Sequence, residues 1–183
     1  MQIRTERLLL RPFEPGDVDD VWAYQRLPEV ARHMLRVPWD RDGAAAFVRL
    51  VMAETAITGA GDALTFAVVL PGSGTVIGEI SLHVYSLLHL SGELGYAFHP
   101  RHQGKGFATE AAEALLRHGF DELGLHRVVA KCSVRNAASA RLMERLGMRR
   151  EAHLIGVRLL NGVWRDEFVY AILADEWRVT RSP

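Results

Sequence analysis

Residues 101 to 110 read Arg101-His102-Gln103-Gly104-Lys105-Gly106-Phe107-Ala108-Thr109-Glu110 and join an apolar strand ending at His99-Pro100 to a strongly helical segment. Two glycines bracket a lysine where the helix begins. Because glycine has no Cβ, successive backbone N–H groups can point inward there, and the positive end of the helix dipole favours an anion such as a diphosphate. The alternative is an ordinary glycine-rich turn between a strand and a helix. The segment is not a P-loop, because the chain has no Gly-Lys-Ser or Gly-Lys-Thr tripeptide.

The elements around this turn predict a mixed α/β fold. A helix is expected over 107–123, between a strand over 93–99 and a strand over 127–134. A helical crossover joins parallel strands, so these two strands are expected to form a parallel pair. Asp17 and Asp40 are expected to cap two helices, which end before Pro28 and at Gly59. The remaining expected elements are an antiparallel meander that begins with strands over 64–70 and 76–90, a first strand over 8–13, a helix over 136–146, and final strands over 150–160 and 163–173.

Length and composition indicate an ordinary globular protein. The 183 residues suit a single domain over 1–183, and 49% of them are hydrophobic. Lysine plus arginine and aspartate plus glutamate number 22 each, so no global basic field attracts nucleic acid. No stretch is apolar enough for a membrane span, and the segment Met1 to Leu10 carries three charges where a signal peptide would be apolar. With a single cysteine, Cys132, excluding an intrachain disulfide, we expect a cytoplasmic protein.

Several motifs follow one another in an informative order. Glu93-Leu94-Gly95-Tyr96 precedes the glycine turn, and Asn136-x-x-Ser139 follows it and leads to Glu144-Arg145-Leu146-Gly147-Met148. This order resembles the GNAT superfamily of acyl-CoA-dependent N-acyltransferases. The opening Thr5-Glu6-Arg7-Leu8-x-Leu10-Arg11-Pro12 and the closing Trp164-x-Asp166 with Glu176-Trp177 are similar to its ribosomal-protein N-terminal acetyltransferase branch, the RimJ/RimL type. The resemblance implies the GNAT fold, a central and mostly antiparallel sheet splayed at a parallel strand pair and flanked by helices.

The resemblance also implies where acetyl-CoA binds. The family's diphosphate loop matches Arg101 to Gly106, so the amides of Gln103 through Ala108 are expected to bind the CoA diphosphate. The strands over 93–99 and 127–134 are expected to splay at their C-terminal ends, and the pantetheine arm would pair with main-chain groups near Ala97 to His99. The implied cofactor-binding residues are Ala97, Phe98, His99, Arg101, Gln103, Gly104, Lys105, Gly106, Phe107, Ala108, Asn136 and Ser139.

Two of these positions have alternative interpretations. Asn136 matches a cofactor contact of the family, yet it also stands where it could cap the following helix. Ser139 matches a position proposed to protonate or hold the departing CoA thiolate, and is otherwise a serine in the first helical turn. Many family members carry a tyrosine four residues later, where this chain has Met143, so Ser139 is the better candidate here. The direction of the hydroxyls of Tyr96 and Tyr170 is not determined by the sequence.

Transfer to an amine requires a neutral amine, so a general base or a water relay is expected. Glu79 lies on a polar stripe of the strand over 76–85 and is the first candidate catalytic base. Glu93 is the second, because it lies on the strand that lines the cofactor in the family. A salt-bridged or solvent-facing carboxylate is the alternative for both. A backbone N–H of the strand over 93–99 is expected to bind the oxyanion.

Metal, nucleic-acid and acyl-enzyme chemistry are not expected. The pair His99 and His102 has no acidic or cysteine ligand at supporting spacing, so no metal site is predicted. Cys132 lies on an expected core strand, which favours direct attack in a ternary complex. The acceptor is expected to be a protein or peptide N-terminal α-amino group. A small-molecule amine such as an amino acid, antibiotic or polyamine is the alternative, with walls over 27–42 and 85–91, and a non-catalytic acyl-CoA sensor is the third. Members of the branch often pair, so a homodimer is one expectation.

Overall fold

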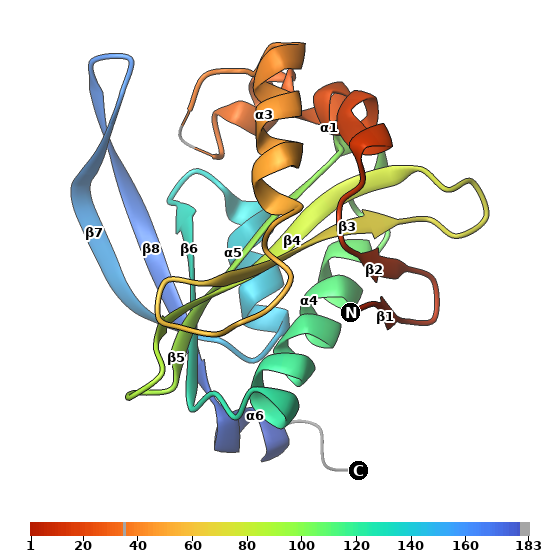
Figure 1. Cartoon of the computed structure of the whole chain (residues 1–183). Helices are drawn as coiled ribbons and strands as arrows, with labels where there is room; N and C mark the ends of the chain where they lie inside the picture. The colour runs from red at the N-terminus through yellow and green to blue at the C-terminus, as the bar shows by residue number, and fades with distance from the viewer. Residues whose placement is uncertain (35, 180–183) are drawn as a thin grey trace.

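A computed structural model describes residues 1–34 and 36–179 of the chain. These residues form an eight-stranded sheet in the order β1-β2-β3-β4-β5-β6-β8-β7, shown with its helices in Figure 1. The strands are β1 (Ile3–Arg4), β2 (Leu9–Arg11), β3 (Ala63–Val69), β4 (Val76–Ser86), β5 (Ser91–Phe98), β6 (Arg127–Ser133), β7 (Arg149–Leu160) and β8 (Val163–Leu173). The helices are α1 (Val18–Gln25), α2 (Pro28–Ala31), α3 (Arg41–Val51), α4 (Phe107–Arg117), α5 (Ala137–Arg145) and α6 (Ala174–Val179). The predicted mixed α/β architecture is confirmed.

Strands β5 and β6 are parallel neighbours, and every other neighbouring pair in the sheet is antiparallel. The parallel ladder begins at Ser91 and Arg127 and ends at Leu94 and Ala130. Beyond that point β5 stays paired with β4 through Phe98, while β6 stays paired with β8. The two strands therefore part at their C-terminal ends, as expected, and leave an opening in the sheet.

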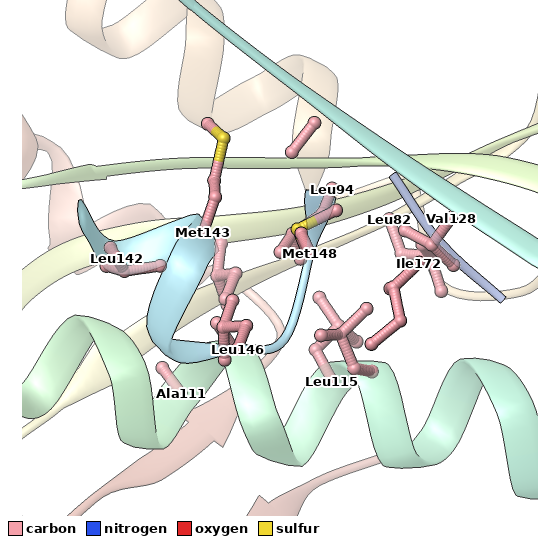
Figure 2. Close-up of a cluster of buried hydrophobic side chains, with 14 of the residues drawn as sticks. Leu82, Leu94, Ala111, Leu115, Val128, Leu142, Met143, Leu146, Met148 and Ile172 are labelled. Atoms are coloured by element: carbon pink, nitrogen blue, oxygen red, sulfur yellow. The ribbon is translucent and has the colours of Figure 1, made fainter. Parts of the chain in front are cut away.

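Both faces of the sheet carry buried side chains. Alternate residues of β3 show this, because Phe66 and Val68 belong to one apolar cluster while Ala67 belongs to the other. The larger cluster packs the sheet against α4 and α5 (Figure 2), and includes Leu82, Leu94, Ala111, Leu115, Val128, Leu142, Met143, Leu146, Met148 and Ile172. The smaller cluster lies under α1 and α3 and includes Phe13, Val21, Tyr24, Val48 and Ala97. Helices α4 and α5 therefore cover one face of the sheet, and α1 and α3 cover the other.

The helix starts near the opening differ in how their first amides are satisfied. Asn136 caps α5, since its side chain accepts a hydrogen bond from the Ser139 amide at 3.1 Å. Asp40 caps α3 through the Gly43 amide, as predicted. At the start of α4 the capping position is Gly106, which has a φ of 81° and offers no side-chain cap. The first amides of α4 therefore have no capping side chain.

Three expectations about local structure were wrong. Asp17 does not cap α1 with its side chain, because its carboxylate accepts two hydrogen bonds from the Arg11 guanidinium, each 2.7 Å long. Helix α3 ends at Val51 rather than at Gly59. The residues that follow include the β-branched Thr55, Ile57 and Thr58, which are poor helix formers, and the Asp62 carboxylate holds the Thr58 and Gly59 amides in a turn instead. Strand β4 ends at Ser86 rather than at residue 90.

No helix in the described ranges is long and apolar enough to cross a membrane.

Candidate active site

A cavity of about 460 Å³ lies where β5 and β6 part. Its walls come from the end of β5, the glycine turn with the start of α4, the start of α5, and α2 with the residues after it. The side chains and backbone that line it belong to Glu29, Val30, His33, Met34, Tyr96, Ala97, Phe98, His102, Gln103, Gly104, Gly106, Phe107, Ala108, Thr109, Asn136, Ala138, Ser139, Leu142 and Arg145. The cavity therefore joins elements that are far apart in the sequence.

The glycine turn presents unobstructed backbone to this cavity. Gly104 has a φ of 74°, and a Cβ built on it meets no atom within 4 Å, so the space in front of it is open. Gly106 has a φ of 81° and precedes the uncapped first turn of α4. An open concave backbone at a positive helix end is the arrangement that binds phosphate oxygens.

The N-terminal segment braces the turn from outside. The Glu110 carboxylate on α4 accepts hydrogen bonds from the Thr5 hydroxyl at 2.6 Å and from the Arg7 amide at 2.8 Å. The Arg7 guanidinium donates to Glu110 at 2.7 Å and to the Lys105 carbonyl at 3.0 Å. These contacts lower the pKa of Glu110, against the effect of its burial. The N-terminal Thr5-Glu6-Arg7 motif is therefore held directly against the first turn of α4 through Glu110.

The hydroxyl of Tyr96 lies 2.6 Å from the hydroxyl of Ser139, at the wall of the cavity. Tyr96 lies on the face of β5 that packs toward α5, opposite to its neighbour Ala97. Burial raises the pKa of Tyr96, so the phenol keeps its proton at neutral pH and can donate a hydrogen bond. Met143 lies among the buried apolar residues (Figure 2), while Tyr170 points elsewhere and donates to Glu144 at 3.1 Å.

Glu79 lies on the other face of the sheet, under α1, with 7% of its surface exposed. One carboxylate oxygen accepts a hydrogen bond from the Tyr24 hydroxyl, and the other accepts one from the Gln25 amide at 2.5 Å. The Arg36 guanidinium in turn donates a hydrogen bond to the side-chain carbonyl oxygen of Gln25. Burial raises the pKa of Glu79 to about 7, although its hydrogen bonds and Arg36 act in the opposite direction. Glu79 opposes Ala97 in the β4–β5 register but does not itself line the cavity.

Glu93 lies in the paired part of β5 and β6, opposite Val129. Its carboxylate forms an ion pair of 2.7 Å with Lys131, and Lys131 also contacts the Tyr85 hydroxyl at 3.3 Å. Glu93, like Glu79, is not among the residues that line the cavity. Of the residues expected to hold the cofactor, only His99, Arg101 and Lys105 are likewise outside the cavity lining.

His99 and Arg101 border a second cavity of about 280 Å³, together with Ala23, Arg26, Leu27, Glu29 and Pro100. His102 faces the main cavity, and its buried Nδ1 has no hydrogen-bond partner among the described residues. Burial and nearby cationic groups lower the pKa of His99 and of His102. Across residues 1–34 and 36–179, no group of three or more potential ligands could hold a metal ion.

Comparisons with known proteins place this architecture among N-acetyltransferases. The chain is 38% identical to the uncharacterized N-acetyltransferase YnaD of Bacillus subtilis, over 97% of this chain and 99% of that protein. It is 28% identical to the ribosomal protein uS5-alanine N-acetyltransferase of Escherichia coli, over 97% of this chain and 93% of that one. The structure of a GNAT family acetyltransferase from Bacillus anthracis matches with a TM-score of 0.85 and 36% identity, covering 96% of this chain and 99% of that one. Spermidine N-acetyltransferase from Vibrio cholerae, solved with CoA and spermine, matches with a TM-score of 0.79 and 25% identity over 94% and 99% of the two chains.

The family model described as an acetyltransferase (GNAT) domain matches residues 7–149. The chain therefore belongs to the GNAT family and is an N-acetyltransferase, as its motifs indicated. GNAT acetyltransferases use acetyl-CoA, and the residues present fit that group: open backbone at Gly104, uncapped amides at the start of α4, and an unpaired edge of β5 beyond Leu94 all face one cavity.

Sequence analysis missed four groups near this site. For Tyr96, strand periodicity predicts only that its side chain lies on the face opposite to Glu93 and Ala97, and does not say which helix covers that face. The Tyr24, Gln25 and Arg36 shell around Glu79 gave no local signal, because Tyr24 and Glu79 are 55 positions apart.

Proposed function

We propose that the chain transfers the acetyl group of acetyl-CoA to a primary amine, by direct attack in a ternary complex. The observation that carries this proposal is the cavity in which the open glycine turn and the Tyr96–Ser139 hydroxyl pair face the same space. Acetyl-CoA supplies an activated thioester when bound. Cys132 is buried on β6, and burial raises the pKa of its thiol, so an acyl-cysteine intermediate is disfavoured.

Tyr96 and Ser139 are proposed to stabilise the leaving thiolate. A phenol whose pKa is raised above 10 is a weaker acid than a thiol near 8.5, so complete proton transfer from Tyr96 is unfavourable. Hydrogen-bond donation to the sulfur needs no such transfer. Ser139 can donate directly while Tyr96 donates to Ser139, which lets the pair act together where Met143 cannot.

Glu79 and Glu93 remain the proposed general bases, and their surroundings differ. A carboxyl with a pKa of about 7 is partly ionised at neutral pH and can accept a proton from an ammonium with a pKa near 8 at little cost. Glu79 would act through a water, because neither Glu79 nor its partner Tyr24 lines the cavity. Glu93 forms an ion pair with Lys131, which occupies one of its two carboxylate oxygens.

The acceptor is proposed to be the α-amino group of a protein or peptide N-terminus. Support comes from the whole-length similarity to the ribosomal protein uS5-alanine N-acetyltransferase and from the absence of net charge on the chain. A small-molecule amine is the second candidate, supported by the structural likeness to the spermidine N-acetyltransferase. We further propose that residues 1–183 form a single domain.

The test is release of the CoA thiol from acetyl-CoA with separate pools of free N-terminal peptides, polyamines and aminoglycosides, and N-blocked lysine peptides. A signal confined to the first pool supports N-terminal acetylation. Calorimetric titration of CoA provides a readout that does not depend on the acceptor. Silence in every pool with CoA bound would contradict catalysis on these amines and favour a non-catalytic acyl-CoA sensor.

A further inference from the structure

The second cavity touches the first at a single residue. Glu29 on α2 lines both, and the lining of the smaller cavity also includes Arg26 at the end of α1 and His99 to Arg101 after β5. Glu29 is the only carboxylate among the described residues that line either space. An ammonium group that enters the main cavity from this side therefore meets one negative charge, at the boundary of the two spaces.

The opposite charge lies directly beyond that boundary. Arg26 and Arg101 both line the smaller cavity and are exposed. The Arg26 guanidinium stacks on the Trp22 ring with its centre 4.9 Å from the ring centroid. The N–H groups of a stacked guanidinium point outward in its own plane, where they can bind an anion. Within residues 1–34 and 36–179, neither guanidinium forms an ion pair with a carboxylate, and Glu29 forms none with a cation.

Glu29, Arg26 and Arg101 all lie near the imidazole ring of His99. The electrostatic influence of Glu29, Arg26 and Arg101 is felt together at His99, where the two arginines lower the pKa of the imidazole and Glu29 raises it. His99 also lies close to Tyr24, with ring centroids 6.5 Å apart, and so next to the shell around Glu79. His99 therefore lies between these three charged groups and Tyr24, which binds the proposed base Glu79.

We propose that the acceptor binds as a zwitterion, with its ammonium at Glu29 and a carboxylate in the smaller cavity between Arg26 and Arg101. The proposal rests on the amine-acetylating function above and narrows its substrate class. A peptide N-terminus with an acidic side chain at position two or three has this chemistry, as does a free amino acid. Polyamines and aminoglycosides lack the anionic group and place further positive charge beside two arginines, which disfavours them.

The experiment compares three amidated peptides, Ala-Glu-Glu-Ala-Tyr, Ala-Gln-Gln-Ala-Tyr and Ala-Lys-Lys-Ala-Tyr, together with free glutamate, in the thiol-release assay. The expected order of kcat/KM is acidic, neutral, basic, with about threefold between steps because such exposed charges are screened. Free glutamate as the better substrate would assign the site to amino acids rather than to peptides. Equal rates for the three peptides would overturn the proposal.

The matched variants are Arg26→Glu and Arg49→Glu, which make the same charge change at a cavity residue and at an exposed residue of α3 that lines neither cavity. Arg26→Glu is expected to lower the acidic-to-basic preference about tenfold, and Arg49→Glu to leave it unchanged. Glu29→Gln is expected to raise KM for every amine about threefold to tenfold without changing the Kd of CoA. Arg26→Gln, with a milder expected loss, keeps the test valid if the reversed charge impairs folding.

Binding provides an independent readout. Titration of the same peptides into the chain saturated with CoA measures the charge preference without turnover. If no amine is acetylated but the acidic peptide binds most tightly, the proposed function fails and the zwitterion site stands. If amines are acetylated with no charge preference, or if Arg26→Glu weakens CoA rather than peptide binding, the zwitterion site fails and the function stands.

Discussion

Replacing Glu79 by glutamine removes a buried titrating group, and the stability of the folded chain should then depend less on pH. The pKa of this carboxyl is raised from 4.5 to about 7 in the folded chain, because burial opposes its ionisation. The folded state therefore binds the proton more tightly than the unfolded state. The stabilisation is complete below the unfolded pKa and is lost as the pH rises from about 4.5 through 7.

The size of this effect follows from the two pKa values. Between pH 5 and pH 8 the free energy of unfolding of the native chain should fall by about 2.5 kcal/mol through Glu79 alone. Histidines with a lowered pKa, such as His99 and His102, add a slope of the opposite sign, but they are present in both proteins and cancel in the difference. The stability of Glu79→Gln relative to the native chain should therefore rise by about 2.5 kcal/mol over this range.

Urea denaturation at pH 5, 6, 7 and 8 measures this difference, which corresponds to a shift of roughly 1 M in the relative midpoint. A difference in stability between the two proteins that is the same at every pH does not count against the prediction, because the amide introduced at position 79 faces the side-chain N–H donor of Gln25. Glu93→Gln is the matched control, since that carboxylate is partly exposed and held by Lys131. A relative stability of Glu79→Gln that stays flat between pH 5 and pH 8 would refute a neutral carboxyl at this site.

Three further predictions concern the cavity and its frame. Ser139→Ala and Tyr96→Phe should each lower kcat about tenfold with an unchanged Kd for CoA, and the double variant should lose little more, because the two hydroxyls act as one unit; single-turnover kinetics with additive losses would contradict that coupling. Gly104→Val places a branched side chain at a φ of 74° in the open space of the turn, so calorimetry should show CoA binding weakened at least about tenfold, and an unchanged affinity in a folded variant would remove the diphosphate role of this turn. Gly78→Ala places a Cβ 2.5 Å from the Ala97 carbonyl oxygen and should cost about 2 kcal/mol or more in urea denaturation, whereas Gly72→Ala, which meets nothing within 4 Å, should cost less than about 0.5 kcal/mol.

Local sequence patterns were sufficient to predict the strands and the helix that surround the site. Alternation over 93–99 and the helical segment after Gly106 predict a parallel strand pair joined by a crossover, and β5, α4 and β6 form that unit. Asn136 caps α5, so one of its two interpretations is confirmed by the hydrogen bond that it accepts from the Ser139 amide. These features depend on residues within a few positions of one another, which is the range that propensity and periodicity describe.

The chemistry of the site depends on contacts that no local pattern describes. Tyr96 meets Ser139 across 43 positions, and Tyr24 meets Glu79 across 55. Strand periodicity places Tyr96 and Glu93 on opposite faces, but which face α5 covers is decided by the apolar packing of α4 and α5 on the sheet. The departure at Met143 was visible in the sequence, whereas the nearby tyrosine hydroxyl from β5 became visible only when the strand and helix were brought together.

The two proposed proton-handling groups lie on opposite faces of the same strand pair. Glu79 points under α1 beside Ala97, while Tyr96, one position earlier on β5, points to Ser139 on α5. An amine that loses its proton toward Glu79 and a thiolate that is stabilised by Ser139 must therefore meet across the sheet, and the place where a sheet can be crossed is the opening beyond Leu94 and Ala130. On this proposal the acceptor enters from the side of α1 and α2, where Glu29 lies, and CoA departs on the side of α4 and α5. The end of the parallel ladder is then the feature that allows two substrates to react without sharing one entrance.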